Sequence, residues 1–227
     1  MLAIIGAAFF GLALIFDLAK TSLGSVVTIY LAVAGIGRLV VCDCDRVERS
    51  NLNRQILHDS SRIGIGKAVS ARETLARLNP SVEVVTLEEV ITADNVKQLV
   101  GDAQVVVDCL DNFDTRYVLN ACAIRKNLPF VHGSVCGLEG RLSFVHVPET
   151  ACLQCIFPGG PPAAAVPVLG ATAGVIGALE AMEVVKYLAK VGNNLKGRLL
   201  TWDGDSMEFR SYRTQRDPQC PSCGRLR

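Results

Sequence analysis

The chain has 227 residues, half of them hydrophobic and a fifth charged, with a formal net charge of +1. This composition excludes a globally disordered chain, and the length suits one large domain or one domain with a small appendage. The balanced charge and the 6% of aromatic residues argue against a nucleic-acid partner, which would need a basic surface or stacking side chains.

Nine cysteines are present, and no cleavable signal peptide is evident. An odd number of cysteines does not suit a secreted disulfide framework. We therefore expect a reducing compartment and a cytoplasmic protein.

The first sixteen residues carry no charge and fall slightly short of the roughly 20 apolar residues of a membrane span. We expect a buried strand followed by a helix here, with a membrane segment as the less favoured alternative. Downstream, hydrophobic periodicity predicts helices at 24–34, 66–78, 92–100 (with Thr92 as N-cap) and 114–126, and strands at 38–43, 82–87, 104–109, 128–135 and 141–147.

The alternation of strands and helices predicts an α/β fold with a Rossmann-like, mostly parallel sheet and helices on both faces. After a Pro/Gly/Ala-rich loop at 157–167, the pattern changes to a long apolar helix at 171–190 and two strand-like runs at 197–203 and 207–213. We expect these last strands to be antiparallel.

Acidic residues follow two of the predicted strands: Asp43 and Asp45 after one, and Asp108 and Asp111 at the end of another. Sites in parallel sheets lie at the carboxyl ends of strands. A strand-end carboxylate such as Asp43 can bind ribose hydroxyls, and Asp111 could hold Mg²⁺ beside phosphates. The alternative for Asp111 is an ordinary helix cap.

Polar and basic residues follow the first acidic pair. Asn51, Arg54 and Gln55 form a cluster in which Arg54 could bind a phosphate bidentately, although a solvated charged loop would look similar. Lys67 opens a predicted helix, where its ammonium and the free backbone N–H groups could bind phosphate. An ordinary surface lysine is the alternative.

Two CxxC pairs give the strongest local signal: Cys152 with Cys155, and Cys220 with Cys223. Four thiolates suit a closed, structural, tetrahedral zinc site, and a redox CxxC is the lesser alternative. Such a site would fasten the end of the chain to its body across the 64 residues between the pairs. The remaining cysteines are expected to be core thiols and the histidines to be structural: Cys42, Cys44, Cys109, Cys122, Cys136, His58, His132 and His146.

These segments together resemble the ThiF/MoeB/HesA family, the prokaryotic relatives of ubiquitin-activating enzymes. The resemblance runs from about Leu23 to Gly224. It is carried by SNLNRQILH (50–58), IGIGKAV (63–69), DCLDN (108–112), the two CxxC pairs and GVIGALEAMEVVKYL (174–188).

The resemblance implies a single adenylation domain over residues 1–227, with zinc-bearing segments at 152–167 and 213–227 and an atypical apolar N-terminus at 1–22. It implies an ATP-dependent adenylyltransferase that activates the C-terminal glycine of a ubiquitin-like sulfur carrier ending in Gly-Gly, in thiamine, molybdopterin or related sulfur metabolism. A homodimer is also implied. Independently of the resemblance, the composition predicts no nucleic-acid partner, and the shortness of the apolar N-terminal stretch makes a membrane partner the less favoured alternative.

The same resemblance assigns roles to individual residues. Asp43 would bind the ribose, Asp111 would hold Mg²⁺, and Arg54, Lys67 and Asp111 would be catalytic. The full nucleotide and Mg²⁺ site that it implies is Gly24, Asp43, Asp45, Asn51, Arg54, Gln55, Lys67, Asp111 and Asn112.

Three segments depart from the family pattern. The family's glycine-rich loop GxGGLGS is represented only by its tail at Leu23-Gly24-Ser25, preceded by DLAKTS (17–22). We expect Gly6 and Gly11 to be a degraded form of this loop with an insertion after it, and bulky Phe9 and Phe10 to crowd a phosphate.

The other two departures are the absence of the family's N-terminal arm and the lack of a cysteine in the segment 165–174. A cysteine-dependent second step at that segment is therefore not expected. Two alternatives stay open: a catalytically impaired scaffold that binds a partner without turning over ATP, and, with little support, a nicotinamide-dependent oxidoreductase.

Overall fold

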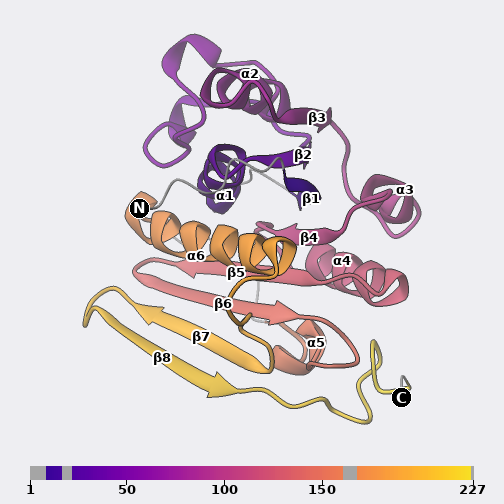
Figure 1. Ribbon diagram of the computed structural model, residues 1–227. Coiled ribbons are helices and arrows are strands. Elements are labelled where there is room, and N and C mark those ends of the chain that lie inside the picture. The colour runs from indigo at the N-terminus through magenta and orange to yellow at the C-terminus, as the bar shows by residue number, and fades with distance from the viewer. Residues whose placement is uncertain (1–8, 17–21, 161–167, 226–227) are drawn as a thin grey trace.

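The computed structural model describes residues 9–16, 22–160 and 168–225 and shows a single eight-stranded sheet with helices on both faces (Figure 1). The α/β fold class expected from the sequence is thus confirmed. The strands are β1 (Phe9–Phe16), β2 (Ile36–Cys42), β3 (Glu83–Leu87), β4 (Val105–Asp108), β5 (Phe130–Cys136), β6 (Glu139–Val145), β7 (Arg198–Asp203) and β8 (Glu208–Arg213). The helices are α1 (Leu23–Val33), α2 (Lys67–Leu78), α3 (Val96–Val100), α4 (Phe113–Lys126), α5 (Leu153–Ile156) and α6 (Gly170–Ala189).

The strand order is β3-β2-β1-β4-β5-β6-β7-β8. Neighbours from β3 through β5 are parallel, and each pair from β5 to β8 is antiparallel, as the sequence predicts. The chain runs outward from β1 through β2 to β3 and then returns to place β4 on the other side of β1. This reversal of direction is a topological switch point, where ligands bind in open α/β sheets.

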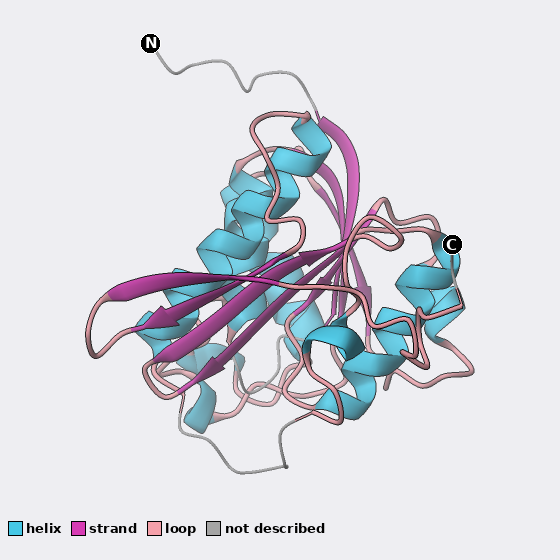
Figure 2. Ribbon diagram, turned by 90° about the horizontal axis from the view of Figure 1, so that it is seen from below, coloured by secondary structure: helices cyan, strands magenta, loops and turns pink. Residues whose placement is uncertain are grey.

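Each face of the sheet has its own hydrophobic core. Leu39 and Val41 of β2 pack on the side of α1, α2 and α6, whereas Val40 and Cys42 pack on the side of α3, α4 and α5. This alternation follows from the pleat of the strand, because successive side chains point to opposite faces. Viewed along the sheet, the long antiparallel strands extend beyond the helical layers (Figure 2).

The expected strand at the N-terminus is present as β1, while residues 1–8 lie outside the described residues. β1 lies inside the sheet between β2 and β4. None of the helices in the described part of the chain is long and apolar enough to cross a membrane.

The position of β1 corrects our interpretation of the glycine-rich loop. Gly11 lies within β1, and Phe9, at the start of the strand, pairs with Ile36 at the start of β2. Phe9 and Phe10 therefore lie at the amino end of the strand, away from the edge where a nucleotide would bind. β1 is followed by residues 17–22 and then directly by α1, so the expected insertion is absent; residues 17–21 lie outside the described residues.

A second correction concerns the helix expected at 92–100. It begins one turn later, at Val96, and its N-cap is Asn95. Thr92 caps the preceding turn instead, because its Oγ1 accepts a hydrogen bond from the Asn95 N–H and its own N–H donates to Asn95 Oδ1. Short polar side chains support such turns as readily as they cap helices.

Candidate nucleotide edge and cysteine cluster

The carboxyl ends of β1, β2 and β4 meet at one edge of the sheet. Phe16, the last residue of β1, pairs with Cys42 on one side and with Asp108 on the other. Asp43 follows β2 and Asp111 follows β4, so both segments leave the sheet at the same edge. The structure brings the two predicted acidic strand ends to a common edge at the switch point.

The N-terminus of α1 also lies at this edge. Ser22, which precedes the helix with a φ of 65°, and Ser25 in its first turn are both fully buried, and neither hydroxyl has a hydrogen-bond partner among the described residues. Ser22 makes no side-chain cap bond, and no acidic residue lies in the first turn. Free N–H groups and the helix dipole favour an anion here, and Gly24 lies between the serines.

Asp43, Asp45 and Lys67 are directly connected. The Asp43 carboxylate accepts a hydrogen bond from the Asp45 N–H at 2.7 Å. Lys67 donates from its backbone N–H to the Asp45 carbonyl at 2.8 Å and from Nζ to the Asp45 carboxylate at 2.9 Å. Lys67 is only 2% exposed, so it is not an ordinary surface lysine; its charge is buried at the start of α2 and paired with a half-exposed carboxylate.

The polar segment after β2 forms two 3₁₀ turns, Arg49–Asn51 and Ser60–Arg62. Glu48 is the N-cap of the first turn, and Asn51 completes a capping box, because its side chain accepts a hydrogen bond from the Glu48 N–H at 3.1 Å. The Arg54 guanidinium donates to the Ser50 carbonyl at 2.8 Å, and Gln55 is fully buried. The segment is thus a folded unit rather than a solvated loop.

Two hydrogen bonds fasten this segment to α2. His58 Nδ1 lies 2.8 Å from Ser70 Oγ, and Arg62 donates to the Ser70 carbonyl at 2.8 Å. Burial, together with the nearby Lys67 and Arg62 cations, lowers the pKa of His58 to about 4. His58 is therefore neutral at neutral pH and has a structural role, as expected from the sequence.

Asp111 and Asn112 lie between β4 and α4. Asn112 is the N-cap of α4, and its side chain accepts a hydrogen bond from the Thr115 N–H at 2.9 Å. The Asn112 amide also donates to the Asp111 carboxylate at 3.3 Å. Helix capping therefore falls to Asn112, and the exposed carboxylate of Asp111 is not the cap of the helix.

A buried arginine that sequence reasoning missed supports this turn. Arg116, 3% exposed, donates from its guanidinium to the Leu110 carbonyl and, at 3.1 Å, to the Gly133 carbonyl. Its Nε lies 3.5 Å from the carboxylate of Asp108, which also accepts from the Leu110 N–H at 3.0 Å. Arg116 thus fixes the backbone immediately before Asp111.

Two further buried groups adjoin this arginine. His132 Nδ1 lies 2.7 Å from the Asp108 carboxylate, and burial is the main cause that lowers the pKa of His132. Glu180 of α6 is fully buried, and neither carboxylate oxygen has a hydrogen-bond partner among the described residues. Burial, and secondarily the Asp108 charge, raises the pKa of Glu180 well above its usual range. Its position on a helix predicted only as long and apolar gave no sign that the carboxyl group would be buried.

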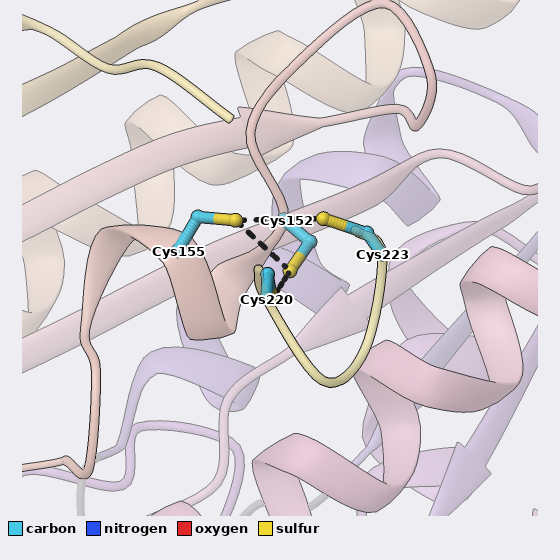
Figure 3. A group of neighbouring side chains, drawn as sticks. All are labelled: Cys152, Cys155, Cys220 and Cys223. Atoms are coloured by element: carbon cyan, nitrogen blue, oxygen red, sulfur yellow. Dashed lines mark hydrogen bonds between the residues drawn. The ribbon is translucent and has the colours of Figure 1, made fainter. Parts of the chain in front are cut away.

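The four cysteines of the CxxC pairs form one cluster, here called the cysteine cluster (Figure 3). The Sγ–Sγ distances are 3.7 Å from Cys152 to Cys155, 3.6 Å from Cys152 to Cys220 and 3.4 Å from Cys155 to Cys223. Tetrahedral zinc with Zn–S bonds of about 2.3 Å separates its sulfurs by about 3.8 Å. The cluster therefore fits a zinc ion and leaves no open coordination position.

Two of the four thiols resist ionisation in the folded protein. Burial raises the pKa of both the Cys152 and the Cys155 thiol, so zinc binding would release their protons. Backbone donors also surround the cluster, since the Asp217 N–H lies 3.4 Å from Cys155 Sγ. These features suit a structural metal centre better than a redox pair.

The expectation of five core thiols is wrong for two of them. Cys42, Cys109 and Cys122 are buried, but Cys44 and Cys136 are exposed. Cys44 lies just beyond the end of β2, and Cys136 is the last residue of β5, where the hairpin to β6 leaves the core. The apolar residues next to both cysteines suggested burial, but they did not show that each strand ends at or just before the cysteine.

The fold and the site define a class: a doubly wound α/β protein with a candidate phosphate-binding edge at its switch point and a four-cysteine metal centre. The chain belongs to the ThiF family, whose model matches residues 22–222. The resemblance inferred from the motifs is thereby confirmed.

Relatives with similar sequences support this membership. The chain is 41% identical over 208 residues to a protein named SAMP-activating enzyme E1 from Haloferax volcanii, covering 89% of this chain and 77% of that protein. It is also 41% identical over 208 residues to Adenylyltransferase and sulfurtransferase MOCS3 from Drosophila sechellia. That alignment covers 88% of this chain but only 46% of the relative, so the chain spans less than half of MOCS3.

Solved structures confirm the fold. The structure described as E. coli MccB with ATP has a TM-score of 0.87 at 21% identity, covering 96% of this chain and 67% of MccB. A structure of PaaA has a TM-score of 0.79 at 20% identity, covering 91% of this chain and 73% of PaaA.

Proposed function

We propose that the chain is an ATP-dependent adenylyltransferase that activates the C-terminal glycine carboxylate of a ubiquitin-like sulfur carrier. The observation that carries the proposal is the meeting, at one sheet edge, of the uncapped α1 N-terminus with its two buried serine hydroxyls and the acidic ends of β2 and β4. Family membership and the relatives named for carrier activation and adenylyl transfer support it.

The reaction forms one bond and breaks one. A carboxylate oxygen of the carrier's terminal glycine attacks the α-phosphorus of ATP, and the bond from that phosphorus to the bridging oxygen breaks, so that pyrophosphate leaves with the electron pair. No general base is needed, because the attacking carboxylate is already ionised at neutral pH.

The assigned residues position the reactants and offset charge. We propose that Asp43 binds the ribose and that Arg54 and Lys67 bind the phosphates, with Gly24, Asp45, Asn51, Gln55 and Asn112 completing the site. Mg²⁺ at Asp111 would neutralise charge on the phosphates. Bringing two anions together needs this electrostatic preorganisation.

The proposal includes a single domain over residues 1–227, a structural zinc ion in the cysteine cluster, a homodimer and a cytoplasmic location. It leaves the pathway as thiamine, molybdopterin or related sulfur metabolism. Equilibrium sedimentation of zinc-loaded protein tests the dimer: twice the chain mass of 24.3 kDa supports it, and a monomer at micromolar concentration contradicts it.

A partner-binding scaffold is the second candidate, and a specific observation favours it. The segment between β1 and α1 reads DLAKTS, and Gly24 is the first glycine after β1, where close approach of backbone to phosphates favours glycine. Calorimetry with Mg·ATP distinguishes the two candidates: saturable binding supports the adenylyltransferase, and no binding to folded, zinc-loaded protein supports the scaffold.

A further inference from the structure

Helix α4 connects the two candidate sites. It begins at Phe113, directly after Asp111 and Asn112 at the nucleotide edge, and runs for 14 residues. Its side chains at positions 113, 117 and 120 share one face, because residues three or four apart are neighbours on a helix. This face lies against the loop 152–160, here called the first cysteine loop, which carries Cys152 and Cys155.

Two hydrogen bonds join this face to the loop. The buried Asn120 side chain accepts from the Leu153 N–H at 3.0 Å, immediately after Cys152. The Tyr117 hydroxyl donates to the Phe157 carbonyl at 2.5 Å, two residues beyond Cys155. Both ends of the short helix α5, which begins after Cys152 and contains Cys155, are therefore attached to α4.

Phe113, at the start of α4, adds packing contacts. Its ring lies edge-to-face with that of Phe157, with centroids 5.6 Å apart. Gly160, with a φ of +65°, lies so close that a Cβ there would be 3.0 Å from Phe113. A side chain at residue 160 would be strained by its own backbone and crowded by this ring. The loop thus closes around the residue that follows Asn112.

The first cysteine loop therefore contacts the first two turns of α4. The first of these turns is capped by Asn112, which is hydrogen-bonded to Asp111. A helix transmits a displacement along its axis because its backbone hydrogen bonds hold it rigid. Loss of the contacts at residues 113, 117 and 120 would free the turn that precedes the helix.

We propose that the zinc-loaded cysteine cluster positions Asp111 through α4, with Tyr117 and Asn120 as positioning residues. The consequence for Mg·ATP rests on the proposed function, whereas the mechanical coupling does not. Linkage is reciprocal: a factor by which zinc tightens Mg·ATP binding is the factor by which Mg·ATP tightens zinc binding.

Native-state amide exchange measures the coupling without any nucleotide. In Tyr117→Phe and Asn120→Ala, loss of one hydrogen bond should accelerate exchange in residues 108–116 by about 2- to 10-fold. Removal of zinc should accelerate it at least as much. The matched control is Lys126→Ala, which removes a bond from the other end of α4 to the Gly101 carbonyl and should leave residues 108–116 unchanged.

Binding affinity gives the second readout. Tyr117→Phe should raise the Kd for Mg·ATP about 2- to 10-fold and leave the Kd for AMP without Mg²⁺ unchanged, because only the Asp111 turn is affected. If amide exchange in residues 108–116 is unchanged in Tyr117→Phe, the coupling is overturned. This test holds even if the zinc-free protein unfolds. If the wild-type protein does not bind Mg·ATP, the proposed function is contradicted. The amide-exchange result alone then tests the coupling between the cysteine cluster and the Asp111 turn.

Discussion

At the candidate nucleotide edge, two oppositely charged side chains differ in burial. Asp111 is exposed and accepts a hydrogen bond from the neighbouring Asn112, while Lys67 is buried and paired with Asp45. Substitution of an exposed surface side chain usually changes stability by no more than about 0.5 kcal/mol. The chemistry at Asp111 can therefore be tested separately from folding.

We expect Asp111→Asn and Arg54→Ala to reduce adenylate formation at least about 100-fold, because each removes charge stabilisation from the transferring phosphate. The midpoint of urea unfolding should stay near that of the wild-type protein. Asp114→Asn is the matched control, because Asp114 is an exposed carboxylate three residues away on α4. Normal turnover in both site variants would contradict the assignment of these residues.

Arg116 is the opposite case, since its role is to hold the backbone. Arg116→Met should lower the free energy of unfolding by roughly 3–5 kcal/mol, because it leaves Asp108 buried without its cation. Arg116→Lys keeps the charge but not the forked geometry and should lose less. Urea denaturation of both variants checks this, and equal losses would show that charge is not the dominant contribution.

Helix α6 buries an acid where the sequence pattern suggested only packing. The Glu180 carboxyl group lies so close to Gly133 of β5 that a Cβ there would be 2.3 Å from Glu180 Cδ. Gly133 is therefore needed for space. The pKa of Glu180 is raised in the folded protein, so between the unfolded pKa of about 4.5 and the folded pKa the carboxyl is protonated in the folded protein and ionised in the unfolded chain.

The pH dependence of stability follows from this difference. The unfolded chain binds fewer protons than the folded protein, so the Glu180 contribution is fully present below the unfolded pKa and is lost as pH rises toward the folded pKa. Glu180→Gln removes this loss. Its free energy of unfolding should rise relative to wild type by up to about 1.4 kcal/mol per pH unit above pH 5. Parallel stability curves for the two proteins would refute the raised pKa.

At the scale of elements, the sequence predicts helices and strands well where a helical hydrophobic period can be told apart from a short continuous apolar run. It places β2 through β8 and α4 within a few residues, and it identifies both acidic strand ends. It predicts a strand at the N-terminus but not the bounds of β1, because an uninterrupted apolar run contains no polar residue to mark where the strand begins. It also misses Arg116 and Glu180, whose burial depends on contacts between α4, α6 and β5 that no local pattern encodes.

For the whole molecule, the cysteine cluster joins segments that are distant in sequence. A zinc ion bound here would close a loop of 64 residues between Cys155 and Cys220. By analogy with a covalent cross-link of that length, the entropy removed from the unfolded chain corresponds to about 4 kcal/mol. The spacing of the two CxxC pairs predicted this cluster because each pair brings two sulfurs to one ion with little help from the rest of the fold.

We expect about one equivalent of zinc per chain, measured by elemental analysis of purified protein. Cys220→Ser should lose zinc and lower the free energy of unfolding by about 4 kcal/mol. Cys44→Ser is the matched control, because Cys44 is exposed and outside the cluster. If wild-type protein without metal had the same free energy of unfolding as protein with zinc, the structural zinc centre would be contradicted.

Carrier-dependent exchange of pyrophosphate into ATP tests the central claim most directly. The assay uses folded, zinc-loaded protein, Mg²⁺ and small ubiquitin-like carriers ending in Gly-Gly, with the same carriers lacking the terminal glycine as controls. We predict exchange above background only with the intact carriers. No exchange with any carrier would contradict adenylation and leave the partner-binding scaffold as the function of this chain.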